Sequence, residues 1–359
     1  MTEAKSNEVR QPWWGTPEES AELLEHLRPA TLSEFGGQPA LSRELGIVLG
    51  SAKARGALCE HLLFVGPAGL GKTTLASIVS NELGLRFASS SGPAIDKPGD
   101  MIGILSSLEA NTLLFIDEIH RLPIACEEVL YTAMEDRRVD VKVGAGMGAR
   151  SIPVPISPFV LVGATTRAGL LSAPLRDRFG FTGRLQLYSD EALGEIIRRS
   201  SVLLGFDADT LSDDAVAIIA SRSRGTPRIA NKWLRRVRDD ALLKGAARVD
   251  AAAASAALEA FGIDALGLDG LGRDILTSLC EGFGGGPVGL STLASSVGES
   301  PETLSEVYEP YLMAKRLLGR TPRGRIATEA AWRHLGLEVP SRALATVAAN
   351  MMQASFDEV

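Results

Sequence analysis

Short apolar segments alternate with longer segments of helical pattern over the first half of the chain. Four of them are strand-sized and bounded by turn residues: HLLFVG (61–66), RFASS (86–90), TLLFID (112–117) and PFVLVGATT (158–166). Nearly continuous apolar runs of this length, separated by helix-length sequence, are typical of parallel strands covered on both faces. The pattern therefore predicts an α/β domain over residues 26–188, with a parallel sheet between two layers of helices.

The pattern changes between residues 139 and 157, where the sequence reads VDVKVGAGMGARSIPVPIS. Two β-rich arms flank a glycine-rich middle, a combination that favours two paired strands joined by a turn. We therefore expect a long hairpin that projects from the sheet.

The second half of the chain is mostly helical in pattern. Residues 189–262 predict a helical domain whose first helix has Ser189 or Asp190 as its N-cap. Glycines and aspartates in 262–272 mark a boundary, and residues 263–336 predict three helical pieces followed by the turn GRTPRGRIAT (319–328). We expect residues 1–25 to be a flexible N-terminal segment. The sequence of the tail, residues 337–359, supports no domain assignment.

Composition narrows the class of protein. Of the 359 residues, 45% are hydrophobic and 23% charged, which is typical of a folded chain. No apolar segment approaches the ~20 residues needed to span a bilayer, and the N-terminus lacks the apolar stretch of a signal peptide. We therefore expect a cytoplasmic protein without a membrane partner.

The three cysteines and four histidines have no metal-ligand spacing. The net charge of −7 disfavours nucleic-acid binding by the whole surface but allows a local basic patch.

The segment FVGPAGLGKTT fits the phosphate-loop pattern G-x-x-x-x-G-K-[ST], with Gly66, Gly71, Lys72 and Thr73 at the defining positions. It follows a predicted strand and opens a predicted helix, which disfavours a chance glycine-rich turn. Backbone N–H groups of such a loop surround phosphates at a helix N-terminus. Lys72 is expected to reach the β- and γ-phosphates of ATP, and Thr73 to ligate Mg²⁺. We expect the neighbouring Gly69, Leu70 and Thr74 to contact the nucleotide as well.

The segment TLLFIDEIHRL places Asp117 and Glu118 at the carboxyl end of a buried strand, the edge at which such sheets bind ligands. Asp117 is expected to hold Mg²⁺ and Glu118 to polarise the attacking water. An acidic pair at a strand end can also cap a helix, but the phosphate loop upstream favours the catalytic interpretation. The sequence therefore predicts an ATP-hydrolysing P-loop NTPase.

Two later segments carry further candidate residues. In LVGATTRAGLLSAPLRDRFGF, Thr165 and Thr166 follow a strand toward the γ-phosphate, and Arg176 or Arg178 is a candidate arginine finger for a neighbouring subunit. In SRSRGTPRIANKWLRRVRDD, Arg228 opens a helix and is a candidate γ-phosphate contact from a mobile lid. The arginines of both segments can instead be solvated or ion-paired surface residues. We expect this of most of the basic residues in the second segment.

A series of segments then points to one family when taken in order: LRPATLSEFGGQ, GPAGLGKTTLA, SGPAIDKPGD, LFIDEIHRL, GATTRAG, PLRDRFG, RGTPRIAN, GGGPVGL, YEPYL and RTPRGRIAT. They resemble the RuvB family, the bacterial AAA+ motors that drive branch migration of Holliday junctions in recombination and DNA repair. The resemblance covers residues 26–336. It implies a P-loop NTPase (AAA+) core of α/β class, a helical lid and a C-terminal winged helix. It also implies a homohexameric ring around double-stranded DNA that works with RuvA and RuvC.

The resemblance assigns roles residue by residue. Asp117 and Glu118 become the Walker B pair, Thr165 or Thr166 sensor 1, Arg228 sensor 2, and Arg178, rather than Arg176, the finger acting in trans. The hairpin 139–157 becomes the RuvA-binding arm. The resemblance also implies nucleotide contacts near the adenine, made by Leu27, Arg28, Phe35 and Tyr188. On the wing it implies DNA contacts made by Arg320, Arg323 and Arg325.

Other AAA+ classes share part of the pattern. A clamp loader would lack the winged-helix module, and a transcription regulator would need a sensor domain for which the chain has no room. A protein unfoldase would carry an aromatic pore loop, and none is evident in the sequence.

Overall fold

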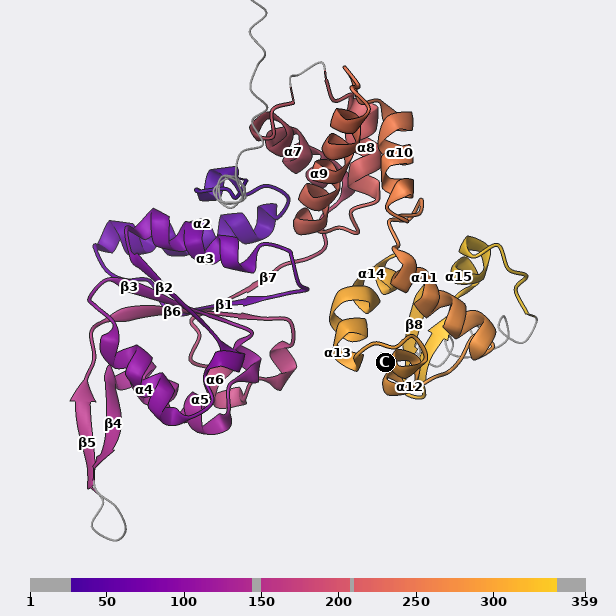
Figure 1. The fold of residues 1–359 in the computed structure, drawn as a ribbon. Coiled ribbons are helices and arrows are strands. Elements are labelled where there is room, and N and C mark those ends of the chain that lie inside the picture. Colours follow the sequence, from indigo (N-terminus) through magenta and orange to yellow (C-terminus); the bar gives the residue numbers. More distant parts are fainter. Residues whose placement is uncertain (1–26, 144–149, 207–209, 341–359) are drawn as a thin grey trace, which may run out of the picture.

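A computed structural model describes residues 27–143, 150–206 and 210–340 of the chain (Figure 1). The expected N-terminal segment, the tip of the predicted hairpin and residues 341–359 of the expected tail lie outside these ranges. Among the residues described, no helix combines the length and the apolar character needed to cross a membrane.

The first domain is built on a five-stranded parallel sheet, which confirms the predicted α/β fold. Its strands lie in the order β2-β3-β6-β1-β7. The four predicted strands are present, and β7 is an additional edge strand that the sequence did not predict, because its few residues show no apolar pattern. The strands are β1 (Leu62–Val65), β2 (Arg86–Ser91), β3 (Thr112–Asp117), β6 (Phe159–Thr165) and β7 (Phe181–Arg184).

Helices cover both faces of this sheet (Figure 1). Helices α2 (Pro39–Arg55) and α3 (Lys72–Leu83) lie on one face, and α4 (Pro98–Ser107), α5 (Ile124–Asp136) and α6 (Ala173–Arg176) on the other. Side chains alternate across a strand, so Phe64 enters the core beneath α2 and α3 whereas Leu63 enters the core beneath α4 and α5. All four residues of β1 are buried. Short 3₁₀ turns join these elements: η1 (Leu32–Glu34), η2 (Gly92–Ala94), η3 (Ile119–Arg121) and η5 (Ala168–Leu170).

The predicted hairpin is present as an antiparallel pair, β4 (Arg138–Val143) and β5 (Arg150–Pro155). It extends away from the body of the domain, next to α5 (Figure 1).

The second domain is helical, as predicted. It contains α7 (Asp190–Leu203), α8 (Asp213–Ser221), α9 (Pro227–Leu243) and α10 (Ala251–Ala260). Ser189 is the N-cap of α7, since its hydroxyl accepts a hydrogen bond of 3.2 Å from the amide of Ala192. One continuous hydrophobic core joins these helices to the α2/α3 side of the sheet.

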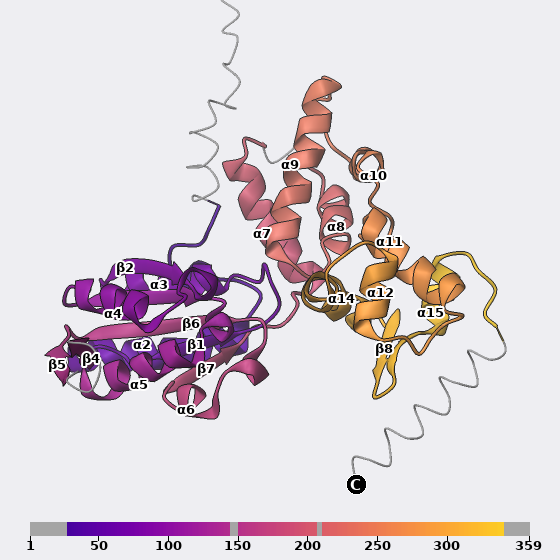
Figure 2. The same cartoon turned by 60° about the horizontal axis from the view of Figure 1, so that its bottom comes forward.

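The third domain has its own hydrophobic core and a winged-helix arrangement. Its helices are α11 (Gly270–Thr277), α12 (Leu290–Ser296), α13 (Pro301–Thr303), α14 (Glu309–Ala314) and α15 (Glu329–His334), with π-helical turns η6 (Ser278–Gly282) and η7 (Leu304–Tyr308). Strands β8 (Leu318–Thr321) and β9 (Gly324–Ala327) pair antiparallel and form the wing. In Figure 2 the second domain lies at the top of the molecule, with the first domain below it on one side and the third domain on the other.

The wing is anchored by a buried ion pair. Arg325 on β9 is 9% exposed and Glu309 at the start of α14 is 4% exposed. The guanidinium donates two hydrogen bonds to the carboxylate, of 2.5 and 3.4 Å. The paired charges connect the wing to the helix that precedes it.

Replacing Glu309 with alanine leaves the Arg325 guanidinium buried without its partner. We expect the third domain to lose about 3–5 kcal/mol of unfolding free energy, the usual cost of breaking a buried ion pair. Denaturant-dependent hydrogen exchange at the β9 amides of the full chain measures this loss. The double variant Glu309→Leu/Arg325→Leu should lose less, because it buries no lone charge. Glu302→Ala, at an exposed position of the same domain, is the control; a Glu309→Ala variant as stable as this control contradicts the anchoring role.

Candidate functional site

A cavity of about 400 Å³ lies at the carboxyl edge of the parallel sheet, between the first domain and the helical domain. Its wall is formed by four groups of residues that are distant in the sequence: 27–29 and 34–36, the loop 68–74, the strand end 117–118, and side chains of the helical domain together with Tyr188 that precedes it. The sheet edge and the helical domain thus enclose one site.

The phosphate loop forms the floor of the cavity. It runs from β1 to α3, and Gly71 takes a left-handed conformation at the N-cap position of α3. The ammonium of Lys72, whose residue is 6% exposed, donates hydrogen bonds of 2.7 Å to the carbonyl of Gly66 and 3.0 Å to that of Pro67. Gly69, Leu70, Thr73 and Thr74 also line the cavity, whereas Gly66 lies at its base and does not. This loop presents a cation and a helix N-terminus to an anion.

The acidic pair stands opposite the loop. Asp117 ends β3, and Glu118 follows with a left-handed φ of 48°, a conformation that non-glycine residues seldom adopt. Such backbone strain at a strand end is common in active sites. Burial raises the pKa of Glu118, Lys72 opposes that shift, and the negative charge of Asp117 adds to it. A carboxyl group of raised pKa is better suited to accept a proton from water than an ordinary glutamate.

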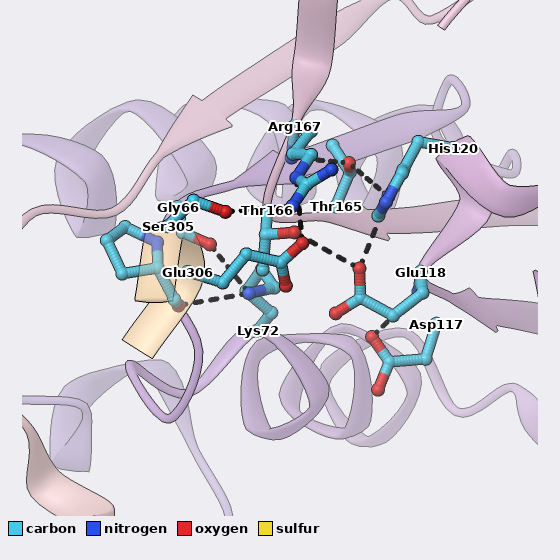
Figure 3. Close-up of polar contacts among 11 residues, drawn as sticks. Gly66, Lys72, Asp117, Glu118, His120, Thr165, Thr166, Arg167, Ser305 and Glu306 are labelled. Atoms are coloured by element: carbon cyan, nitrogen blue, oxygen red, sulfur yellow. Dashed lines mark hydrogen bonds and ion pairs between the residues drawn. The ribbon is translucent and has the colours of Figure 1, made fainter. Parts of the chain in front are cut away.

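Thr165 and Thr166 do not line the cavity. Figure 3 shows both of them close to Glu118 and His120. Thr166 donates a hydrogen bond of 3.3 Å to Oε2 of Glu118. Thr165 is fully buried and shares a hydrogen bond of 2.9 Å with Nδ1 of His120. The same His120 nitrogen lies 3.2 Å from Oε2 of Glu118.

His120 is a site residue that the sequence analysis missed. Burial lowers its pKa, so the ring is held neutral and can donate only one N–H at a time. It connects Glu118 to Thr165 and thereby fixes the direction of the carboxylate. The sequence held one signal for this role. His120 lies two residues after Glu118, in the turn that follows the predicted strand.

The other end of the cavity is mostly apolar. Leu27, Phe35 and Tyr188 are each buried and line it together with Arg28. The Tyr188 hydroxyl donates to the carbonyl of Leu70 at 3.2 Å, which ties this end to the phosphate loop. The structure thus brings together all four residues predicted to lie near the adenine.

Helix α9 contributes Arg228, Asn231 and Arg235 to the cavity at helical spacing. Arg228 was predicted, whereas Asn231 was not. Lys232 and Arg236, expected near the same face, instead lie over the rings of Trp233 and Phe261.

Helix α7 contributes a further cation that the sequence analysis missed. Arg199 lines the cavity and donates hydrogen bonds to the carbonyls of Leu27 at 2.7 Å and Glu34 at 3.2 Å. This contact ties the N-terminal cavity segment to the helical domain. The sequence carried no signal for it, because the two segments meet only in the folded chain.

Arg178 does not line this cavity. Its guanidinium pairs with Glu135 at 3.0 Å, donates to the carbonyl of Pro174 at 2.7 Å and lies 4.7 Å from the centre of the Tyr131 ring. It is therefore held on a different face of the first domain, at a partly exposed position.

The three wing arginines are separated by the fold. Arg320 on β8 and Arg323 in the turn are exposed. The expectation that Arg325 stands beside them at the surface is corrected, because its guanidinium is buried against Glu309. It would reach a phosphate only by giving up that partner.

Thr73 and Asp117 fit the role of Mg²⁺ ligands in their chemistry. A hydroxyl and a carboxylate oxygen are the hard donors that Mg²⁺ takes, usually with water and phosphate oxygens completing the octahedron. Both residues line the cavity. Among the described residues no cluster of three or more histidine, cysteine or acidic side chains could hold a metal by itself.

Comparison with known proteins covers almost the whole described chain. Three family models match: the Holliday junction DNA helicase RuvB P-loop domain over residues 27–185, the RuvB AAA lid domain over 188–264, and the RuvB C-terminal winged helix domain over 265–336. The Holliday junction branch migration complex subunit RuvB of Corynebacterium jeikeium is 54% identical over 314 residues, 88% of each chain. That of Cutibacterium acnes is 55% identical over 324 residues, 90% of this chain and 93% of its own. The solved Thermotoga maritima RuvB Holliday junction branch migration motor is 48% identical, with a TM-score of 0.80 over 88% of this chain and 99% of its own.

The contact between the phosphate loop and the helical domain can be tested at Gly69. A Cβ there would lie 2.7 Å from Cγ2 of Thr226, and the φ of +80° disfavours any side chain. We expect Gly69→Ala to weaken nucleotide binding several-fold, because its methyl group would push Thr226 and the lid away from the phosphate loop. Gly84→Ala is a matched control, because Gly84 has a φ of +62° with open space around it. Titration with a fluorescent ADP derivative measures both; equal affinities in the two variants contradict the contact.

Proposed function

The chain belongs to the RuvB family, and we propose that it is the ATP-driven motor that pumps duplex DNA to drive branch migration of Holliday junctions in recombination and repair. The observation that carries this is the cavity in which a phosphate loop, an acidic strand end and an arginine of the lid face one another. RuvA and RuvC are the proteins it acts with. Its substrate, junctions in chromosomal DNA, places the activity in the bacterial cytoplasm.

ATP is bound with its base between the 27–35 segment and Tyr188 and its phosphates on the loop 69–74. Lys72 neutralises the β- and γ-phosphates, and Arg228 approaches the γ-phosphate from the lid. Thr73 and Asp117 would hold Mg²⁺, which supplies charge neutralisation on the phosphate oxygens when bound. Because Arg228 belongs to a separate domain, binding energy at the phosphates can move the lid relative to the sheet.

Hydrolysis depends on the Glu118 carboxylate. Glu118 accepts a proton from the attacking water as that water approaches the γ-phosphate. Thr166 and His120 hold the carboxylate in place through the contacts described above. The neutral His120 connects Glu118 with Thr165, so the sensor strand and the catalytic carboxylate move as one unit.

The subunits act as a homohexameric ring in which Arg178 serves the neighbouring site. Its position outside the subunit's own cavity supports this, because a guanidinium there can reach only a nucleotide bound by another chain. Tyr131 and Glu135 hold it without enclosing it completely. The hairpin 139–157, which extends from the same domain, is the arm that contacts RuvA.

The winged helix grips DNA through Arg320 and Arg323. Both are exposed: Arg320 lies on β8, and Arg323 lies with Pro322 in the two-residue turn between β8 and β9, which can approach the sugar–phosphate backbone. Contacts to phosphates fix position without reading sequence, as a motor that moves along any DNA requires. Arg325 supports the wing from beneath.

Substitution of the wing arginines tests DNA binding separately from ATP binding. We expect Arg320→Ala and Arg323→Ala each to lower the slope of log affinity against log salt by about 0.9, the value for one phosphate contact. DNA-stimulated ATP turnover should fall while ATP affinity stays unchanged. Fluorescence anisotropy with a duplex at several salt concentrations measures the slope. Arg86→Ala, an exposed arginine on β2, is the control and should leave it unchanged; wing variants that keep the wild-type slope contradict the assignment.

Mixed rings test whether Arg178 acts in trans. Lys72→Ala and Arg178→Ala should each lack ATPase activity alone. An equal mixture should regain activity, because roughly a quarter of the interfaces then pair an intact phosphate loop with an intact finger. Arg176→Ala, two residues away, should keep activity by itself and serves as the control. A mixture without activity shows that each subunit uses its own Arg178.

A further inference from the structure

The winged helix reaches the ATPase site through two consecutive residues of the turn η7 (Figure 3). Glu306 forms an ion pair with Arg167, with 2.7 Å between its Oε1 and Nε of the arginine. Nη2 of Arg167 donates a hydrogen bond of 2.9 Å to the Ser305 hydroxyl. Arg167 directly follows the sensor threonines, and its backbone N–H donates to the Thr165 hydroxyl at 2.9 Å. The DNA-binding domain is thus attached to the sensor segment itself.

Glu306 belongs electrostatically to the catalytic site. Its side chain is 24% exposed and that of Arg167 33%, so the pair is only partly screened by water. Burial lowers the pKa of Lys72, while the charges of Glu118, Asp117 and Glu306 oppose that shift. The Glu306 charge also adds to the raised pKa of Glu118 and partly offsets the lowered pKa of His120. The pKa values of Lys72, Glu118 and His120 therefore all depend on a carboxylate from another domain.

Glu306 adds a third carboxylate to the charges beside the phosphate loop. Asp117, Glu118 and Glu306 face the cations Lys72, Arg228 and Arg167 in the same cluster, and Glu306 already pairs with Arg167. The γ-phosphate of ATP would bring additional negative charge next to Lys72, where like charges in a partly buried site repel strongly. ADP brings no charge to that position.

We propose that the ion pair between Glu306 and Arg167 holds the winged helix against the ATPase site, and that the Glu306 carboxylate competes with the γ-phosphate of ATP. We call this ion pair the latch. The inference rests on the proposed binding of ATP at this site. The docked arrangement is favoured with ADP or without nucleotide. Entry of the γ-phosphate repels Glu306, releases Arg167 and frees the winged helix. Because coupling between two binding events is reciprocal, a position of the winged helix that DNA favours also changes the affinity for ATP.

The latch predicts a difference between two nucleotides. With the full chain and Mg²⁺ present, Glu306→Gln should bind the non-hydrolysable analogue AMPPNP about tenfold more tightly than the wild type, within the usual range of coupling between sites. ADP affinity should change by less than about twofold, since ADP does not meet Glu306. Glu302→Gln removes the same charge from an exposed position of α13 and should leave both affinities unchanged. Calorimetric titration of each variant gives the AMPPNP-to-ADP ratio.

Arg167→Gln provides a double-mutant cycle. If the ion pair is the latch, Glu306→Gln should have a much smaller effect in the Arg167→Gln background than alone. Equal effects in both backgrounds, or equal shifts for AMPPNP and ADP, would overturn the latch. Failure of the wild type to bind either nucleotide, or unchanged binding in Lys72→Ala, would instead remove the proposed function.

Hydrogen exchange of the unmodified protein gives a second measurement that needs no substitution. The amides of η7 and the start of α14 should exchange several-fold faster with AMPPNP than with ADP, because the contact with Arg167 is lost. Protection that is the same with both nucleotides contradicts the release of the winged helix.

Discussion

The close approach of the phosphate loop to three other segments is the constraint on which the site depends. A Cβ at Gly66 would lie 2.7 Å from the carbonyl of Leu185 after β7, one at Gly69 the same distance from Thr226 of the lid, and one at Gly71 3.2 Å from the Phe35 ring. The close approach excludes a side chain at Gly66 and Gly69, and the φ of +102° disfavours one at Gly71. Through them the loop is in contact with the sheet edge, the lid and the apolar end of the cavity at once, so a displacement of any one of these segments also moves the loop.

The carboxylate of Glu118 has a similar dependence on its neighbours. Glu118 sits in a strained backbone conformation, and its direction is fixed by Thr166 and by a buried neutral histidine. These partners come from β6 and from the turn after β3, strands that are adjacent in the sheet. The parallel register of the two strands thus decides where the carboxylate points, and through Arg167 it connects the same carboxylate to the winged helix.

Four charged residues of the third domain differ in burial and in what they face. Exposed Arg320 and Arg323 can meet DNA, buried Arg325 is paired with Glu309, and half-buried Glu306 faces the ATPase site. All of them lie within a short stretch of sequence, yet they lie on the exposed wing, in the domain core and beside the cavity. This arrangement places the exposed wing arginines and the carboxylate beside the cavity on one small domain with a single core.

The sequence by itself determined the features that depend on local spacing. The phosphate loop, the acidic strand end, the hairpin, the capped first helix of the lid and the basic turn of the wing each need only neighbouring residues, because backbone conformation and helix geometry act over a few positions. The strand β7, the position of His120, the cavity contacts of Asn231 and Arg199, and the burial of Arg325 were decided by the tertiary structure. So was the contact between Arg167 and Glu306. Each of these depends on which distant segment packs against a side chain, and a charged or polar residue has the same local pattern whether it faces water, a partner or a ligand.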